Sequence, residues 1–191
     1  IRLRRIHRYI HVGELGLDQL EAADRLPELM AVVDVRDHHV HAGLHDAERA
    51  GRQAQLIEQA VDQKVDGIAV TLATPDALKD ALKKAADAGI PIVSLNAGES
   101  VATQLGAFTH FGSNEQLAGQ AVGTKLAEGG FKRPVCVIQA QGHVGLEARC
   151  AGVKSKVPGT EILYVNGADM TSVESTATAK LQASKDADVI I

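Results

Sequence analysis

The chain has 191 residues, of which 45% are hydrophobic, and its formal net charge is −4 at pH 7. Such a chain can bury a core large enough for one α/β domain or for two smaller lobes. The charge pattern excludes the concentrated basic surface that nucleic-acid binding requires, and no apolar run reaches the length, about 18 residues, that predicts a membrane-spanning helix.

The first 52 residues differ in composition from the rest of the chain. They contain eight arginines and no lysine, whereas ten lysines and two arginines follow. They also lack Ser, Thr and Asn, which globular segments use for helix caps and turns. We interpret residues 1–52 as an atypical segment. It is either a genuine His/Arg-rich extension or the translation of a wrong reading frame, and we favour the second.

Four histidines of this segment invite a metal-site interpretation, because His41 and His45 stand four residues apart, as ligands on a helix do. Gly43 between them and the absence of a nearby cysteine disfavour it. The alternative, which we favour, is a solvated or artefactual histidine run that begins with His38 and His39. We predict no metal site and no cofactor. The chain begins with Ile1, shows no signal peptide and ends within a predicted strand, so we expect both ends to be truncated.

From residue 53 onward, strands and amphipathic helices alternate. Leu56, Ile57, Ala60 and Val61 recur at helical spacing, and a strand is predicted over 65–72. Thr74 as N-cap, with Pro75 at the first helical position, predicts a second helix that Gly89 ends. Its predicted buried residues are Ala77, Leu78, Ala81, Leu82 and Ala85. The next strand is expected over 90–95.

The same alternation continues to the end of the chain. Ser113 and Gln116 predict a capping box for a helix that runs to Gly129, with an inner face of Leu117, Ala121, Val122 and Leu126. The predicted elements that follow are a strand over 135–139, a helix over about 143–156, a strand over 162–165, a helix opened by a Thr171/Glu174 capping box and a final strand. Apolar strands between amphipathic helices are typical of a parallel sheet covered on both faces.

Polar side chains follow the predicted strands at 71–74, 96–99, 139–147 and 166–170. Ligands of parallel sheets bind at the carboxyl ends of the strands, and amides, hydroxyls and a carboxylate suit hydroxyl-rich solutes. Alternatively, Asn96 and Asn166 only make turns. The lone imidazole of His143 belongs to the same set. Because no phosphate-binding loop or nucleophile elbow is present, we predict that the chain is not an enzyme.

The two cysteines, Cys136 and Cys150, are too few for a disulfide framework and lack metal-ligand spacing. They are either two buried thiols or one disulfide formed in an oxidising compartment. The strand that carries Cys136 runs into the helix that carries Cys150, which folds back over the sheet. We therefore expect their Cα atoms to lie within about 7 Å of each other.

Several stretches resemble one protein family in order and spacing. QAQLIEQAVDQKVDGIAVTLATPDALKDALKKAADAGIPIVSLNAG resembles the second half of the N-terminal lobe of type I periplasmic sugar-binding proteins. FTHFGSNEQLAGQAVGTKLAEGG is similar to their crossover into the second lobe, and that lobe continues with VCVIQAQGHVGLEARCAGV and ILYVNGADMTSVESTATAKLQ. The resemblance covers roughly 53–191. It implies an α/β, two-lobed fold of parallel sheets flanked by helices, incomplete in this chain, with lobe parts at 53–107 and 108–191.

The resemblance also implies a function and a ligand site. Its members bind a sugar between two lobes and deliver it to the permease of an ABC importer, from the periplasm or from a lipid anchor on the outer face of the membrane. Asn96 corresponds to a sugar-hydroxyl partner, and Met170 lies where the family can place an aromatic wall. Glu147 stands where ribose-binding proteins often have an arginine, a departure that puts ribose in doubt. With His143, these residues are our candidate ligand contacts, and we expect them to face one cleft.

A second interpretation is the effector domain of a lactose-repressor-type transcription regulator, which shares this fold. It would need a helix-turn-helix segment at the N-terminus, and residues 1–52 lack most of the polar side chains that contact bases and phosphates. A small α/β enzyme is a third class, but no catalytic motif supports it.

Overall fold

The computed structural model describes residues 30–33 and 46–191. The chain divides into two compact units, between Gly112 and Ser113. The division falls later than the boundary that we expected after residue 107, because the strand β4 (Ala107–Gly112) pairs with the sheet of the first unit. Among the described residues, no helix is long and apolar enough to cross a membrane.

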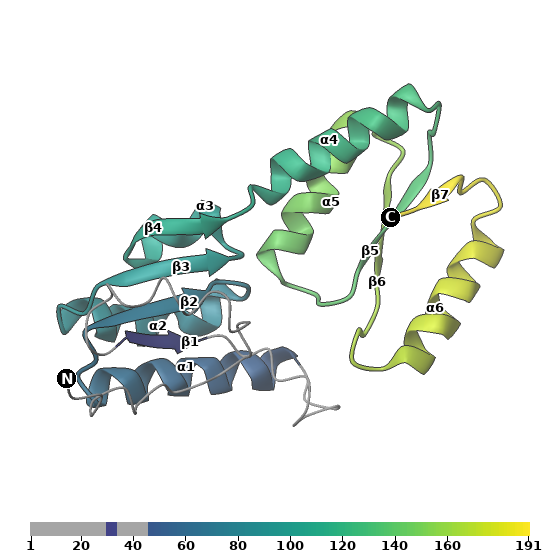
Figure 1. Ribbon diagram of the computed structural model, residues 1–191. Coiled ribbons are helices and arrows are strands. Elements are labelled where there is room, and N and C mark those ends of the chain that lie inside the picture. The colour runs from purple at the N-terminus through teal and green to yellow at the C-terminus, as the bar shows by residue number, and fades with distance from the viewer. Residues whose placement is uncertain (1–29, 34–45) are drawn as a thin grey trace, which may run out of the picture. The chain divides into compact units, whose positions relative to one another are not determined.

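The first unit contains, within its described residues, a parallel sheet with the strand order β1-β2-β3-β4. Its other strands are β1 (Met30–Val33), β2 (Gly67–Thr71) and β3 (Ile92–Asn96). The helices are α1 (Asp46–Asp62), α2 (Pro75–Asp87) and the short α3 (Glu99–Ala102), which a 3₁₀ turn follows at Thr103–Leu105. Figure 1 shows α1 and α2 beside this sheet. Because α1 crosses residue 52 without interruption, the change in composition does not coincide with an element boundary.

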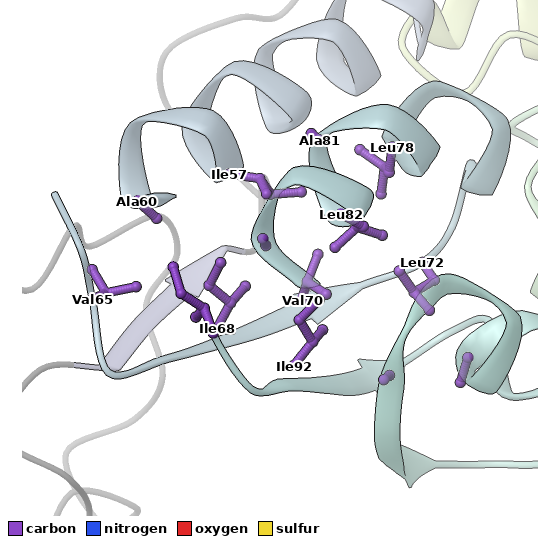
Figure 2. Packing of buried hydrophobic residues seen from close by; sticks show 14 residues of the cluster. Ile57, Ala60, Val65, Ile68, Val70, Leu72, Leu78, Ala81, Leu82 and Ile92 are labelled. Carbon is purple, nitrogen blue, oxygen red and sulfur yellow. The ribbon is translucent and has the colours of Figure 1, made fainter. Parts of the chain in front are cut away.

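The core of the first unit lies between the helices and the sheet. Figure 2 shows Ile57 of α1 and Leu82 of α2 reaching toward Val70 of the central strand β2. All three side chains are fully buried, so truncating one of them to alanine should cost about 2–5 kcal/mol. The residues of this cluster are Ile57, Ala60, Val65, Ile68, Val70, Leu72, Leu78, Ala81, Leu82, Ala85, Ile90, Ile92, Ala102 and Ala107.

The helix α2 agrees with its prediction at both ends. Thr74 is the N-cap and Pro75 the first helical residue, while Gly89 follows the helix with a φ of 74°, the left-handed conformation that favours glycine. Of the predicted buried residues, Leu78, Ala81, Leu82 and Ala85 are buried and Ala77 is exposed. Helical periodicity therefore identified the core-facing side of this helix.

The second unit, all of which the structure describes, contains a parallel sheet with the strand order β6-β5-β7. The strands are β5 (Pro134–Ile138), β6 (Glu161–Tyr164) and β7 (Val189–Ile190). The helices are α4 (Glu115–Glu128), α5 (Val144–Lys156) and α6 (Met170–Ala183). In Figure 1, α5 and α6 lie on opposite sides of this sheet.

Two predicted capping boxes are wrong. The N-cap of α4 is Asn114, whose side chain accepts a hydrogen bond from the Leu117 N–H, and not Ser113. The N-cap of α6 is Asp169, which accepts from the Ser172 N–H, and not Thr171. Asn and Asp cap helices as well as Ser and Thr do, so a capping-box pattern does not decide between neighbouring candidates.

The predicted inner face of α4 is also wrong. Leu117 is 61% exposed and Val122 is 41% exposed, whereas Gly119 and Gly123 are buried against α5. A Cβ atom at Gly119 would lie 2.0 Å from the Arg149 carbonyl oxygen. The two helices therefore pack backbone against backbone, and this contact, rather than the burial of large side chains, sets which face of α4 turns inward.

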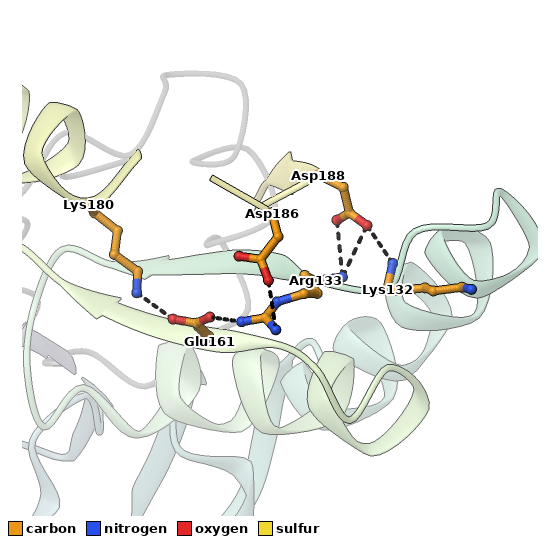
Figure 3. A network of polar contacts seen from close by, with 6 residues as sticks. All are labelled: Lys132, Arg133, Glu161, Lys180, Asp186 and Asp188. Atoms are coloured by element: carbon orange, nitrogen blue, oxygen red, sulfur yellow. Dashed lines mark hydrogen bonds and ion pairs between the residues drawn. The ribbon is translucent and has the colours of Figure 1, made fainter. Parts of the chain in front are cut away.

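The amino ends of the strands of the second unit form an edge, here called the amino edge, that is bound together by charges (Figure 3). The Asp188 carboxylate accepts hydrogen bonds from the backbone N–H groups of Lys132, at 2.6 Å, and Arg133. The Arg133 guanidinium pairs with Glu161 at 2.9 Å and with Asp186 at 2.8 Å. These contacts join the starts of all three strands.

The cysteines form a disulfide that links β5 to α5. The Cα atoms of Cys136 and Cys150 lie 5.8 Å apart, which confirms that the two residues are near neighbours. Both are buried, and they pack with Ile138, Leu146 and Ile162. The disulfide therefore fixes α5 on the face of the central strand.

Candidate functional site

The carboxyl ends of β5 and β6 define the opposite edge of the second sheet, here called the carboxyl edge. Glu147, in the first turn of α5, lies at this edge and is half-buried. The Tyr164 hydroxyl donates to its Oε2 atom at 3.1 Å, and the Gly142 N–H donates to its Oε1 atom at 3.4 Å. The carboxylate is thus held by one group from the loop after β5 and one from the end of β6.

Sequence reasoning missed Tyr164. We predicted a strand over 162–165 and searched only the residues after it, but β6 ends at Tyr164 itself. Its position could have pointed to it. Tyr164 is the last residue of β6, and β6 pairs with β5, the strand that precedes the loop and helix carrying Glu147. A search that includes the last residue of each strand would therefore have included it.

The hydrogen bond to Glu147 raises the pKa of the Tyr164 phenol, and partial burial and the negative charge of the carboxylate act in the same direction. The hydroxyl therefore stays protonated and remains a donor through the neutral pH range. The nearby cation Arg149 forms an ion pair with Glu115 of α4 at 2.6 Å. Its charge is directed toward the contact between α4 and α5.

His143 is the N-cap of α5. Its Nδ1 atom accepts a hydrogen bond from the Leu146 N–H at 3.4 Å, which requires that nitrogen to be unprotonated. The contact fixes the start of the helix one turn before Glu147. A role of His143 in ligand binding stays a prediction, whereas its capping role is part of the structure.

Met170 is the first residue of α6 and is 70% exposed, so its side chain is free of the core of its unit. The loop before it is ordered by a turn in which Asn166 Oδ1 accepts from the Ala168 N–H at 3.1 Å. The Gly167 N–H donates to the Gln139 carbonyl at 2.9 Å. The loop that leads to Met170 is therefore tied to the loop that leads to Glu147.

In the first unit, Asn96 ends β3 with an exposed side chain and a φ of 60°. Asparagine tolerates this left-handed conformation better than most residues do. Behind it, Gly98 packs so closely that a Cβ atom there would lie 2.4 Å from Leu72 Cβ. The buried Gln53 amide donates to the Thr71 carbonyl at 2.9 Å and thereby fixes the end of the neighbouring strand. The structure thus offers one exposed amide at a rigid strand end.

The predicted contacts belong to different units. His143, Glu147 and Met170 lie in the second unit at or near one edge of its sheet, and Asn96 lies at the carboxyl end of a strand in the first. That all of them face one cleft stays a prediction. A surface cavity of about 390 Å³ opens at the amino ends of β2 and β3, lined by residues such as Val61, Val65 and Ile90, and contains none of the predicted contacts.

No group of three metal-ligating side chains occurs within the ranges 30–33 and 46–191. The histidines that raised a zinc interpretation, His38, His39, His41 and His45, lie outside the described residues. Glu147 and Tyr164, the side chains that meet at the carboxyl edge, are hydrogen-bonding groups. Parallel sheets with amide, phenol and carboxylate groups at their strand ends are typical of ligand-binding α/β proteins.

The periplasmic binding protein domain model matches residues 37–191. The chain therefore belongs to the periplasmic binding protein family, whose members are substrate-binding proteins. The match reaches back into the segment that composition set apart, further than the resemblance that we traced from residue 53. The comparison with curated proteins finds no significant match.

Solved structures agree with this assignment. A carbohydrate transporter from Acidothermus cellulolyticus 11B, in complex with myo-inositol, is 48% identical over 74% of this chain and 50% of its own, with a TM-score of 0.71. A periplasmic sugar-binding protein of an ABC sugar transporter from Legionella pneumophila is 28% identical over 78% of this chain and 55% of its own, with a TM-score of 0.68. An ABC transporter solute-binding protein from Burkholderia graminis, in complex with D-arabinose, is 25% identical, covers 72% and 49%, and has a TM-score of 0.63. The chain thus spans about half the length of these structures.

Proposed function

We propose that this chain is part of an extracytoplasmic solute-binding protein that binds a neutral, polyhydroxylated ring and delivers it to the permease of an ABC importer. The observation that carries the proposal is the carboxyl edge, where Glu147 is held by Tyr164 and Gly142 as a fixed acceptor. Sugar hydroxyls need such buried or half-buried acceptors, because an unpaired hydroxyl loses affinity. No bond is made or broken in this function.

The first ligand to test is myo-inositol. The transporter from Acidothermus cellulolyticus was solved with this cyclic polyol and shares 48% of its residues with this chain in the matched region. In the proposed site, Asn96 and Glu147 bind ring hydroxyls, His143 borders them, and Met170 covers an apolar face of the ring. The family resemblance implies that two lobes close on the ligand and hide it from water.

An extracytoplasmic location is consistent with the disulfide between Cys136 and Cys150. Disulfides persist in oxidising compartments and are rare where glutathione keeps thiols reduced. The permease is the implied partner, because the similar proteins named above are transport components.

Calorimetric titration of the full-length gene product with myo-inositol and a panel of sugars tests the proposal. Asn96→Ala and Glu147→Ala should each weaken binding about 5- to 150-fold, because each leaves a ligand hydroxyl without its partner. Thermal stability without ligand should hardly change in Glu147→Ala, whereas Asn96→Ala should lose some stability, because alanine tolerates a φ of 60° less well than asparagine does. Glu128→Ala is the matched control, since this exposed carboxylate of α4 pairs only with Lys125 among the contacts described. Undiminished affinity in both site variants would refute the site.

A further inference from the structure

We propose that Tyr164 is a positioning residue that fixes the Glu147 carboxylate in the orientation that receives two neighbouring hydroxyls of the ligand. This inference rests on the proposed function and names how its site selects a ligand. It does not follow from the family pattern that we traced, which assigned no role to Tyr164.

The first step concerns the geometry of the carboxylate. The Tyr164 hydroxyl binds one of its oxygens at 3.1 Å, and the Gly142 N–H binds the other at 3.4 Å. Two donors on two different oxygens fix the carboxylate plane, which one donor alone leaves free to rotate. One donor comes from the loop after β5 and the other from the end of β6, so the plane is defined relative to the sheet rather than to α5 alone.

The second step concerns the acceptor sites that remain. An ionised carboxylate has about four lone-pair positions, two on each oxygen. With one position on each oxygen occupied by the protein, one remains on each for a ligand. Two adjacent acceptors suit two neighbouring hydroxyls on a ring. The phenol oxygen can accept one further hydrogen bond, because a hydroxyl both donates and accepts.

The third step concerns the entropy of binding. A glutamate side chain has three rotatable bonds, and ordering such a side chain on binding costs conformational entropy. Glu147 is held before any ligand arrives, so this cost is met during folding. Tyr164 is 43% exposed, and its hydroxyl holds Glu147 from the end of β6 at 3.1 Å. The residue thus acts through Glu147 and needs no ligand contact of its own.

The test is a double-mutant cycle in the full-length gene product, with myo-inositol as the probe. Tyr164→Phe keeps the ring and removes the hydroxyl, and should weaken binding about 3- to 10-fold. In the Glu147→Ala background the same change should alter affinity less than twofold, because the group that it positions is gone. Leu181→Ala is the control, since Leu181 is equally exposed at 43% but lies near the far end of α6.

A second measurement needs no ligand. The chain has two tyrosines, so the Tyr164→Phe variant identifies which phenol titrates in an ultraviolet absorbance titration. Tyr164 should ionise at a higher pH in the unchanged protein than in Glu147→Gln, with circular dichroism to show that both remain folded. A phenol titration that Glu147→Gln leaves unchanged would overturn the inference.

The outcomes separate the two proposals. If the unchanged protein binds none of the polyols or sugars, the proposed function is wrong and this inference is wrong with it. If the unchanged protein binds myo-inositol but Tyr164→Phe costs nothing, or costs as much with Glu147 absent as with it present, only the inference is wrong. If Tyr164→Phe weakens binding only when Glu147 is present, and the phenol titration shifts in Glu147→Gln, both proposals are supported.

Discussion

Cys136 of β5 and Cys150 of α5 are joined by a disulfide that closes a loop of sequence separation 14, and this loop carries both His143 and Glu147. Closing a loop of this length removes conformational freedom from the unfolded chain and stabilises the fold by about 3 kcal/mol. Urea unfolding with and without a reductant should differ by about this free energy. The double variant Cys136→Ala/Cys150→Ala should be insensitive to the reductant, and equal midpoints for the oxidised and reduced protein would contradict the expectation.

Glycine-to-alanine substitution should have opposite effects on stability at Gly119, where α4 approaches α5, and at Gly51 in α1. Gly119→Ala should destabilise the protein by about 1–3 kcal/mol, because its Cβ would meet the Arg149 backbone at 2.0 Å. Among the described residues, a Cβ atom at Gly51 in α1 meets nothing within 4 Å, so Gly51→Ala should stabilise the protein by about 0.5–1 kcal/mol through helix propensity. Thermal unfolding of the two variants measures both. Similar effects of equal sign would refute the packing argument.

The amino edge should make the second unit sensitive to acid. Hydrogen bonds from the Lys132 and Arg133 N–H groups lower the pKa of Asp188, and contacts with Lys180 and then Arg133 lower that of Glu161. Each carboxylate has a lower pKa in the folded than in the unfolded state. Its contribution is therefore present above the ordinary carboxyl range, about pH 4, and is lost as the pH falls through the folded pKa.

Asp188→Asn tests this expectation. The variant should be less stable than the unchanged protein at pH 7, and the difference should shrink as the pH falls below about 4. Urea unfolding at a series of pH values measures it, with Glu128→Gln on α4 as an exposed control that should show little change. A stability difference that stays constant down to the lowest pH would mean that the carboxylate charge is not what matters.

Glu147 should discriminate against acidic ligands. Its carboxylate accepts the Gly142 N–H, so it occupies the start of α5, where an anion would otherwise be favoured by the helix dipole. Glucuronate should therefore bind more weakly than glucose, and Glu147→Gln should reduce that difference. Competition calorimetry at two salt concentrations measures it, because a charge effect weakens as salt increases. Equal discrimination in the variant would assign the selectivity to another group.

Much of the fold follows from local patterns. The ends of α2 were predicted because Pro75 and Gly89 mark them, and the parallel sheets because their strands are apolar throughout. The helix predicted over about 143–156 agrees with α5 to within one residue. The buried face of α4 could not be predicted from periodicity, since glycines that face a neighbouring backbone carry no hydrophobic signal. Tyr164 was missed because only the residues after each predicted strand were searched, and Tyr164 is the last residue of its strand.

The composition change near residue 52 is a different case. The structure carries α1 across it, and the family match begins at residue 37, so part of the segment shares in the fold. Its origin in a wrong reading frame stays a prediction that sequencing of the locus would test. The prediction rested on the absence of capping and turn residues. That absence alone does not show how the segment is encoded, because part of the segment folds as α1.

The two edges of the second sheet differ in their side chains. Ion pairs and hydrogen bonds to carboxylates hold the strands together at the amino edge. Glu147, Tyr164 and Met170 lie at or near the carboxyl edge. An exposed side chain such as Met170 contributes little to the core, so its replacement changes what the edge can hold without unfolding the sheet below it. Under the proposed function, single substitutions at this edge would change the ligand while each variant stays folded. Diversification of transport specificity within one fold would then require few compensating changes in the interior.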